Sequence, residues 1–294
     1  MAGPKRLRLR LIEAAARVGG RLFMPTAAAL QEEELASGAF GDEAEIPETI
    51  RVIDRGSDTT VFSFSSAGLL HTGLPTFAFE GLFERQDRAY NLVFLRDVHR
   101  TAYHLTPAGE PTGLAHYEAT LRDTMKRLGA KRHVAIGESS GAAAALYFGT
   151  RCGMDKVVAF SLPYPIQIWT SLAAVLRAVF NLPELLRDPA GYWEVLMITL
   201  FSVLARRALR RHVGDAIFNP LTTYLEATPR PQLTLHYGER CRPDAQIAAK
   251  IDSASEARCV PFPTGRHILW SSIARQGSLE QLLMRELENP DSGS

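Results

Sequence analysis

The chain has 294 residues, of which 46% are hydrophobic, and 33 basic against 32 acidic side chains leave a net charge of +1. This composition predicts a globular protein with a sizeable core, and the near-zero net charge argues against nucleic acid as a partner. The 3 cysteines lack metal-like spacing, which predicts free thiols in a reducing compartment and no disulfide framework.

Residues 1–48 form a charged extension of the predicted core. Residues 1–20 are rich in arginine but lack the unbroken apolar stretch of a secretion signal, and residues 22–50 contain acids but no lysine or arginine. The arginine-rich segment fits either an amphipathic helix on an anionic membrane surface or a solvated helix docked on the protein. We therefore expect a cytoplasmic protein, with peripheral contact at the inner membrane face as the alternative to a freely soluble one.

Short runs rich in β-branched and aromatic residues alternate with helical patterns along the rest of the chain. This alternation predicts an α/β fold with a mostly parallel, doubly wound sheet. Helices are expected at 116–129, where Gly129 supplies a C-cap, and directly after Ser139. The predicted strands are 49–54, 60–66, 91–97, 133–137, 156–163, 232–238 and 257–263.

The alternation is interrupted at 164–228, which holds no clear strand. Two apolar segments, 166–180 and 192–213, are each expected to form a helix. The apolar run 195–205 is too short to cross a bilayer, and an arginine cluster at 206–211 follows it. An insertion at this point would lie over the carboxyl ends of the strands as a lid. The predicted division is an extension at 1–48, a core at 49–163 and 229–294, and a helical lid at 164–228.

The segment from Val134 to Leu146 contains the motif G-x-S-x-G, formed by Gly137, Ser139 and Gly141. Small residues at this junction could simply let a helix pack closely on a strand. The same spacing, between a predicted strand and a predicted helix, is that of the turn that presents a serine nucleophile above a sheet. The helix N-terminus that follows would also favour developing negative charge.

Two further side chains in the sequence suit a serine nucleophile. His267 follows the last predicted strand, and both Glu239 and Asp244 lie in the predicted loop after the strand before it. A serine hydroxyl needs a neighbouring base, and a carboxylate must hold that base in one tautomer. The chain order is serine, acid, histidine, with Asp244 preferred and Glu239 kept as the alternative acid.

The elbow, the acid Asp244 and the turn that ends in His267 resemble those of the α/β-hydrolase superfamily, a resemblance that spans about residues 49–285. It implies that Ser139 is the nucleophile, His267 the general base and then acid, and Asp244 the group that orients the imidazole. The oxyanion would be held by the backbone N–H of Ser140 and by an N–H of the loop at Ser66 and Ala67.

The apolar side chains of the lid exceed what two helices need to dock on a sheet, so we expect part of them to line an acyl pocket. Trp169, Trp193 and Phe201 are the expected substrate-binding residues there. His71, which lies just past the predicted oxyanion loop, is the fourth expected substrate-binding residue.

These features predict a serine hydrolase or acyltransferase that forms an acyl-enzyme from a small-molecule or carrier-linked ester or thioester. Cofactor and metal motifs are absent from the sequence, so neither is expected. The segments 91–97 and 137–163 also look like bacterial hydrolase-like proteins linked to surface-polysaccharide modification, apart from Leu162 and Pro163, where a Pro-Gln pair is expected. The alternative function is a non-catalytic, hydrolase-like partner in a membrane-proximal assembly.

Overall fold

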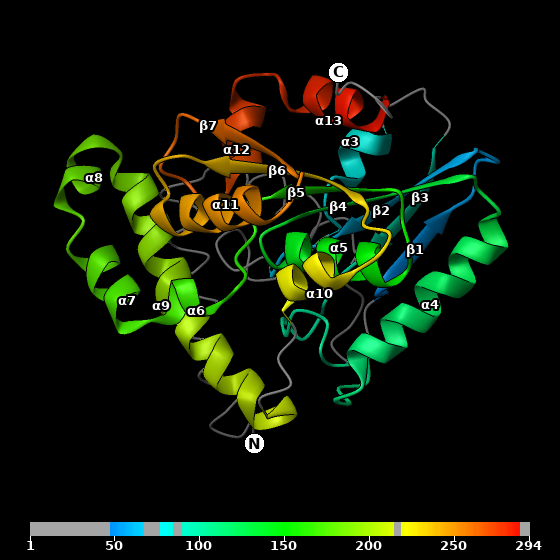
Figure 1. Cartoon of the computed structure of the whole chain (residues 1–294), viewed down its shortest axis with the longest axis horizontal. Helices are drawn as coiled ribbons and strands as arrows, with labels where there is room; N and C mark the ends of the chain where they lie inside the picture. The colour runs from blue at the N-terminus through cyan, green and yellow to red at the C-terminus, as the bar shows by residue number, and fades with distance from the viewer. Residues whose placement is uncertain (1–47, 68–76, 85–89, 215–218, 289–294) are drawn as a thin grey trace.

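The computed structural model describes residues 48–67, 77–84, 90–214 and 219–288 (Figure 1). The predicted extension at 1–48 lies outside the described residues except for residue 48. His71 also lies outside them.

A seven-stranded sheet forms the centre of the molecule, in the order β1-β3-β2-β4-β5-β6-β7. Neighbouring strands are parallel, except that β1 pairs with β3 in the antiparallel sense. The mostly parallel sheet and the seven predicted strands are confirmed. The strands are β1 (Ile50–Ile53), β2 (Thr59–Phe64), β3 (Asn91–Leu95), β4 (Arg132–Glu138), β5 (Lys156–Phe160), β6 (Gln232–Gly238) and β7 (Arg258–Phe262).

The central strands are apolar throughout because helices cover both faces of the sheet. On β2, Phe62 packs into one buried cluster and Val61 into the other, and on β4 Ala135 and Ile136 divide in the same way. One face is covered by α4 (Gly113–Leu128), α5 (Ser140–Arg151), α10 (Pro220–Glu226) and α11 (Arg242–Ala254), and the other by α3 (Glu80–Glu84), α12 (Leu269–Arg275) and α13 (Leu279–Glu288).

Three predicted strands end two or three residues earlier than expected. The strand expected at 60–66 ends at Phe64, the one at 91–97 ends at Leu95, and the one at 156–163 ends at Phe160. The residues that follow leave the sheet to build loops at its carboxyl edge, where binding sites of parallel sheets occur. The expected C-cap of α4 is confirmed, since Gly129 adopts φ 61° there.

The insertion contains α6 (Gln167–Thr170), α7 (Leu172–Val179), α8 (Leu182–Arg187) and α9 (Pro189–Val213), which pack on one another at one edge of the molecule (Figure 1). The single helix expected at 166–180 is wrong: Ser171 is extended, with ψ 150°, and its side chain accepts a hydrogen bond from the N–H of Ala174 to cap α7. No helix in the described part of the chain is both long and apolar enough to cross a membrane.

Candidate active site

Ser139 occupies a tight turn between β4 and α5. Its backbone has φ 53° and ψ −122°, and non-glycine residues rarely adopt positive φ. A Cβ at Gly137 would overlap the backbone of Gly141, and a Cβ at Gly141 would overlap the backbone carbonyl of Phe64. The two glycines of the motif are therefore required by close backbone packing, and the turn presents Ser139 at the start of a helix.

The side chains of Ser139, His267 and Asp244 are distant in sequence but form one hydrogen-bonded row, with Ser139 at one end. Nε2 of His267 lies 2.9 Å from Oγ of Ser139, and Nδ1 of His267 lies 3.0 Å from both carboxylate oxygens of Asp244. His267 and its partner Asp244 are both buried, at 0% and 1% exposure. A carboxylate in this position holds a proton on Nδ1 and leaves Nε2 free to accept the serine proton.

Asp244 contacts His267 from the first turn of α11, not from a loop as expected. The helix begins directly after Cys241, and Pro243 suits a first turn because the N–H that proline lacks has no partner inside the helix. The side chain of Asp244 thereby points into the protein. Glu239, the alternative acid, is exposed and lies on the loop before the helix. The geometry supports Asp244 as the partner of His267.

Trp169 packs against the imidazole of His267. The two ring centroids are 4.8 Å apart at an interplanar angle of 72°, and the indole is fully buried. The edge-on contact is a favoured geometry for aromatic pairs and keeps water away from one side of the histidine. Trp169 thus supports the ring of His267.

Acidic side chains of the insertion fasten it to the loop that carries His267. Asp188 forms two hydrogen bonds with the guanidinium of Arg266, at 3.1 and 3.2 Å. Glu194, which is buried, accepts a hydrogen bond of 2.6 Å from the backbone N–H of Ile268. The residues on both sides of His267 are therefore held by the insertion, which positions the histidine backbone.

A third acid, Glu184 of α8, packs against the same loop at Gly265, two residues before His267. A Cβ at Gly265 would overlap the carboxylate of Glu184, so a larger residue at this point of the loop would displace that side chain. The carboxylate also lies 3.9 Å from Nε of Arg240 as an ion pair. Sequence analysis missed Glu184, Asp188 and Glu194, although acids inside apolar segments such as "YWEVLM" are a signal of buried polar contacts.

Several buried ionisable groups surround the row. Burial raises the pKa of Glu138 well above its ordinary value, and the negative charges of Glu194 and Asp244 raise it further. Burial likewise raises the pKa of Glu194. Asp244 thus shares its surroundings with two buried carboxyl groups whose pKa values are raised.

Cys241, Asp244 and His267 present atoms that could bind a metal ion within 4.8 Å of one another. A metal would need the thiolate of Cys241, but burial raises the pKa of that thiol well above its ordinary value, and the charge of Asp244 raises it further. Asp244 and His267 also already satisfy each other. The group fits a hydrogen-bonded acid and base better than a metal centre.

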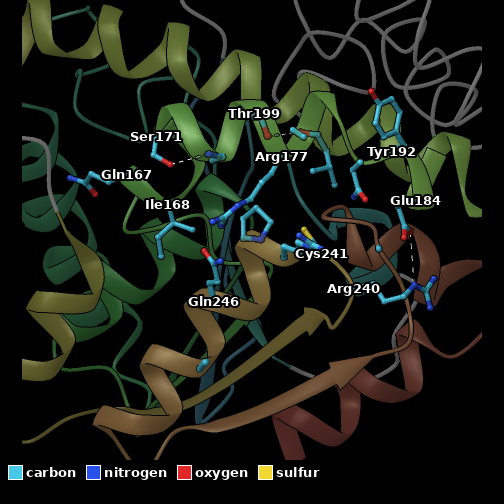
Figure 2. Close-up of a pocket in the computed structure, with 18 of the residues that line it drawn as sticks. Gln167, Ile168, Ser171, Arg177, Glu184, Tyr192, Thr199, Arg240, Cys241 and Gln246 are labelled. Carbon is cyan, nitrogen blue, oxygen red and sulfur yellow. Dashed lines mark hydrogen bonds and ion pairs between the residues drawn. The ribbon is translucent and has the colours of Figure 1, made fainter. Parts of the chain in front are cut away.

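A cavity of about 510 Å³ lies between the insertion and α11 (Figure 2). Arg177 reaches into it from α7 towards Gln246 of α11, and Cys241 lies on its wall (Figure 2). Neither Ser139 nor His267 lines it. The cavity is therefore adjacent to the hydrogen-bonded row, on the side of Cys241 and Asp244.

The expected acyl-pocket residues do not line this cavity. Trp169 lies against His267, whereas Trp193 and Phe201 lie on α9, the first 38% exposed and the second half-buried. Their role in substrate binding stays a prediction.

No protein-family model and no curated protein matches the sequence. Solved structures do match the fold. A candidate esterase from Staphylococcus aureus superposes with a TM-score of 0.56 at 12% identity, covering 89% of this chain and 92% of that one. Capsule O-acetyltransferase of Neisseria meningitidis serogroup A gives a TM-score of 0.50 at 12% identity, covering 85% and 99%. MenH from S. aureus gives 0.50 at 14% identity, covering 82% and 98%. The chain has the α/β-hydrolase fold.

In this α/β-hydrolase fold the expected oxyanion loop lies next to the turn at Ser139. β2 is parallel to β4 with Phe64 opposite Gly137, so the chain leaves both strands at the same edge. Ser66 and Ala67 follow β2 there and are partly exposed, and Ser140 begins α5 beside them. The close approach of Gly141 to the backbone of Phe64 and Ser65 brings the two segments together. Their part in holding an oxyanion stays a prediction.

Proposed function

We propose that the protein is a serine hydrolase or acyltransferase that acts on an ester or thioester. The observation that carries this proposal is the row from Ser139 through His267 to Asp244, with contacts of 2.9 and 3.0 Å, at a strained turn that begins a helix. Two of the similar structures are named as an O-acetyltransferase and a candidate esterase. Both names describe enzymes of ester chemistry, which supports the same class.

In the proposed first step, Oγ of Ser139 attacks the substrate carbonyl while Nε2 of His267 takes the serine proton. Asp244 accepts a hydrogen bond from Nδ1–H and stabilises the imidazolium that forms. The backbone N–H of Ser140, with one of the loop at Ser66 or Ala67, would hold the oxyanion. His267 then protonates the leaving group, and an acyl-Ser139 ester remains.

In the second step, water or an acceptor alcohol attacks the acyl-enzyme and His267 acts as base again. The packing of Trp169 on His267 and the contacts of the insertion with its loop exclude water from the back of the histidine. We propose short acyl groups as substrates, because the fully buried Trp169 fills the space next to the base.

Labelling with a fluorophosphonate tests the activated serine. The wild type should label, whereas Ser139→Ala and His267→Ala should not. Ser140→Ala is the matched control, because only its backbone N–H is assigned a role, and it should label like the wild type. A folded wild type that does not label, or labelling that persists in Ser139→Ala, would favour the non-catalytic partner function instead.

The acyl group can be sized with p-nitrophenyl esters. We expect kcat/KM to be highest for acetate and to fall with chain length. A kcat/KM that instead rises about fourfold for each methylene buried, towards octanoate, would restore the long acyl pocket expected from the sequence.

A further inference from the structure

The large apolar side chains that are exposed in the described part of the chain all belong to the insertion, between Leu172 and Leu204. Leu186 at the end of α8 is 85% exposed and Leu172 at the start of α7 is 74% exposed. Isolated exposed apolar residues are common on soluble proteins, but a concentration on one small segment marks an interaction surface.

Helix α7 turns its large apolar side chains away from the protein. Leu172, Leu176 and Val179 lie at helical spacing on one side and are 74%, 47% and 38% exposed, whereas Ala178 faces inward and is buried. A helix that serves only to pack on a core shows the reverse arrangement. Figure 1 shows α7 and α8 at the outer edge of the molecule, on the far side of α9 from the sheet.

Charges on the insertion are also segregated. Its acids Glu184, Asp188 and Glu194 face the protein, where they hold Arg240, Arg266 and the backbone of Ile268. Arg177 reaches into the cavity, and the other exposed charged side chains between residues 172 and 211 are also arginines, namely Arg187, Arg207, Arg210 and Arg211. The surface turned to solvent is therefore both apolar and positively charged.

Helix α9 carries the two properties along one stripe. Leu200, Leu204, Arg207 and Arg211 follow one another at spacings of three and four residues, so they lie on one face, and each is exposed. Apolar side chains that enter the acyl layer beside arginines that reach lipid headgroups are typical of helices that lie in a membrane interface.

We propose that this outer face, formed by the exposed apolar side chains between Leu172 and Leu204 and by Arg187, Arg207, Arg210 and Arg211, docks on the surface of an anionic lipid bilayer. No described helix could cross the membrane, so the contact is peripheral. A second copy of the chain fits less well, because a symmetric contact would bring arginines against arginines with no acid on the face to offset them. The proposal stands apart from the esterase chemistry, since it uses none of the residues of the hydrogen-bonded row.

Sedimentation of the full-length protein with vesicles tests the proposal. Binding should be strong with vesicles of equal parts phosphatidylglycerol and phosphatidylcholine, weak with phosphatidylcholine alone, and weaker as salt is raised. Ser139→Ala should bind like the wild type, so failure of the proposed catalytic function and failure of membrane binding are separate results.

Paired variants locate the contact. Leu172→Ser with Leu186→Ser should lower the vesicle partition coefficient at least about tenfold, because two leucines no longer enter the acyl layer. Arg207→Gln with Arg211→Gln should lower it about thirtyfold, at about fivefold for each charge. Lys126→Gln with Arg127→Gln on α4 removes the same charge from the opposite end of the molecule and is the matched control.

Three results would overturn the proposal. The first is a wild type that does not distinguish anionic from neutral vesicles. The second is wild-type binding in both insertion variants, which would assign membrane contact to another part of the chain. The third is a wild-type dimer in analytical ultracentrifugation that becomes a monomer in Leu172→Ser with Leu186→Ser, while vesicle binding of this variant is unchanged. That result would assign the face to self-association.

Discussion

The contact between Glu194 and the backbone of Ile268 offers a direct test of whether the insertion positions the base. Glu194→Ala removes the acceptor of a buried hydrogen bond of 2.6 Å and leaves the N–H next to His267 without it. A buried donor left unsatisfied costs about 1–3 kcal/mol of stability. The backbone of His267 would then relax, and a displacement of the base by about 1 Å can cost about a hundredfold in rate.

Steady-state kinetics distinguish a displaced His267 from a loss of protein stability. For p-nitrophenyl acetate we expect Glu194→Ala to lower kcat by about tenfold to a hundredfold with KM little changed, because the base acts in the transition state and not in ground-state binding. Glu194→Gln retains an oxygen acceptor of the same shape and should recover most of kcat. Leu200→Ala, which removes an exposed side chain from the same helix, should leave kcat unchanged.

Urea denaturation of the same variants completes the test. Glu194→Ala should remain folded at the assay temperature with a lower unfolding free energy. If its kcat per folded molecule equals that of the wild type, or if Glu194→Gln is as impaired as Glu194→Ala, the hydrogen bond does not position His267 and the reasoning is wrong.

Asp244→Asn should lower kcat at least about tenfold more than Glu239→Gln, because an amide partner misorients the imidazole of His267, and the reverse order of the two rates would transfer the role to Glu239. Burial raises the pKa of Glu138, so the folded state retains a proton that the unfolded chain loses above about pH 4.3, and stability falls as pH rises. Glu138→Gln should therefore gain unfolding free energy over the wild type as pH is raised from 5 to 8, and a pH-independent difference in urea denaturation would contradict this. Burial alone would raise the pKa of Glu286, but its close contact with His236 and its hydrogen bond from Lys156 outweigh burial and hold the pKa well below its ordinary value. Glu286→Gln should lower the unfolding free energy by about 3–5 kcal/mol at pH 7. Its deficit should shrink as pH falls below about 4, because the unfolded wild-type chain then binds a proton at this carboxyl while the folded protein keeps it ionised; a constant deficit in thermal or urea melts would refute the assignment.

The prediction of the fold from the sequence rests on local patterns that the structure preserves. Each central strand is a short apolar run because both of its faces are buried, so its position is visible without knowledge of its neighbours. The end of α4 at Gly129 and the turn at Ser139 are visible for a similar reason, since the backbone conformation of each depends on the glycines at or beside it. These elements were within reach of sequence reasoning.

The partner of His267 was decided by tertiary structure. Glu239 and Asp244 are both acids after the same strand, and they differ only in that the first turn of α11 directs Asp244 inward. The break of the predicted helix at Ser171 was not predicted, because apolar residues at helical spacing lie on both sides of it and hide the capping serine.

What the sequence determined by itself was the periodicity of its elements and the identity of the reactive residue types. The meeting of Ser139 with His267, 128 residues away, was predicted only through the resemblance to α/β-hydrolases, whereas the contact of Glu194 with Ile268, 74 residues away, was decided by the tertiary structure alone. It also decided that the apolar side of α7 faces outward, because helical periodicity marks an apolar face but carries no information on whether protein or solvent lies beside it.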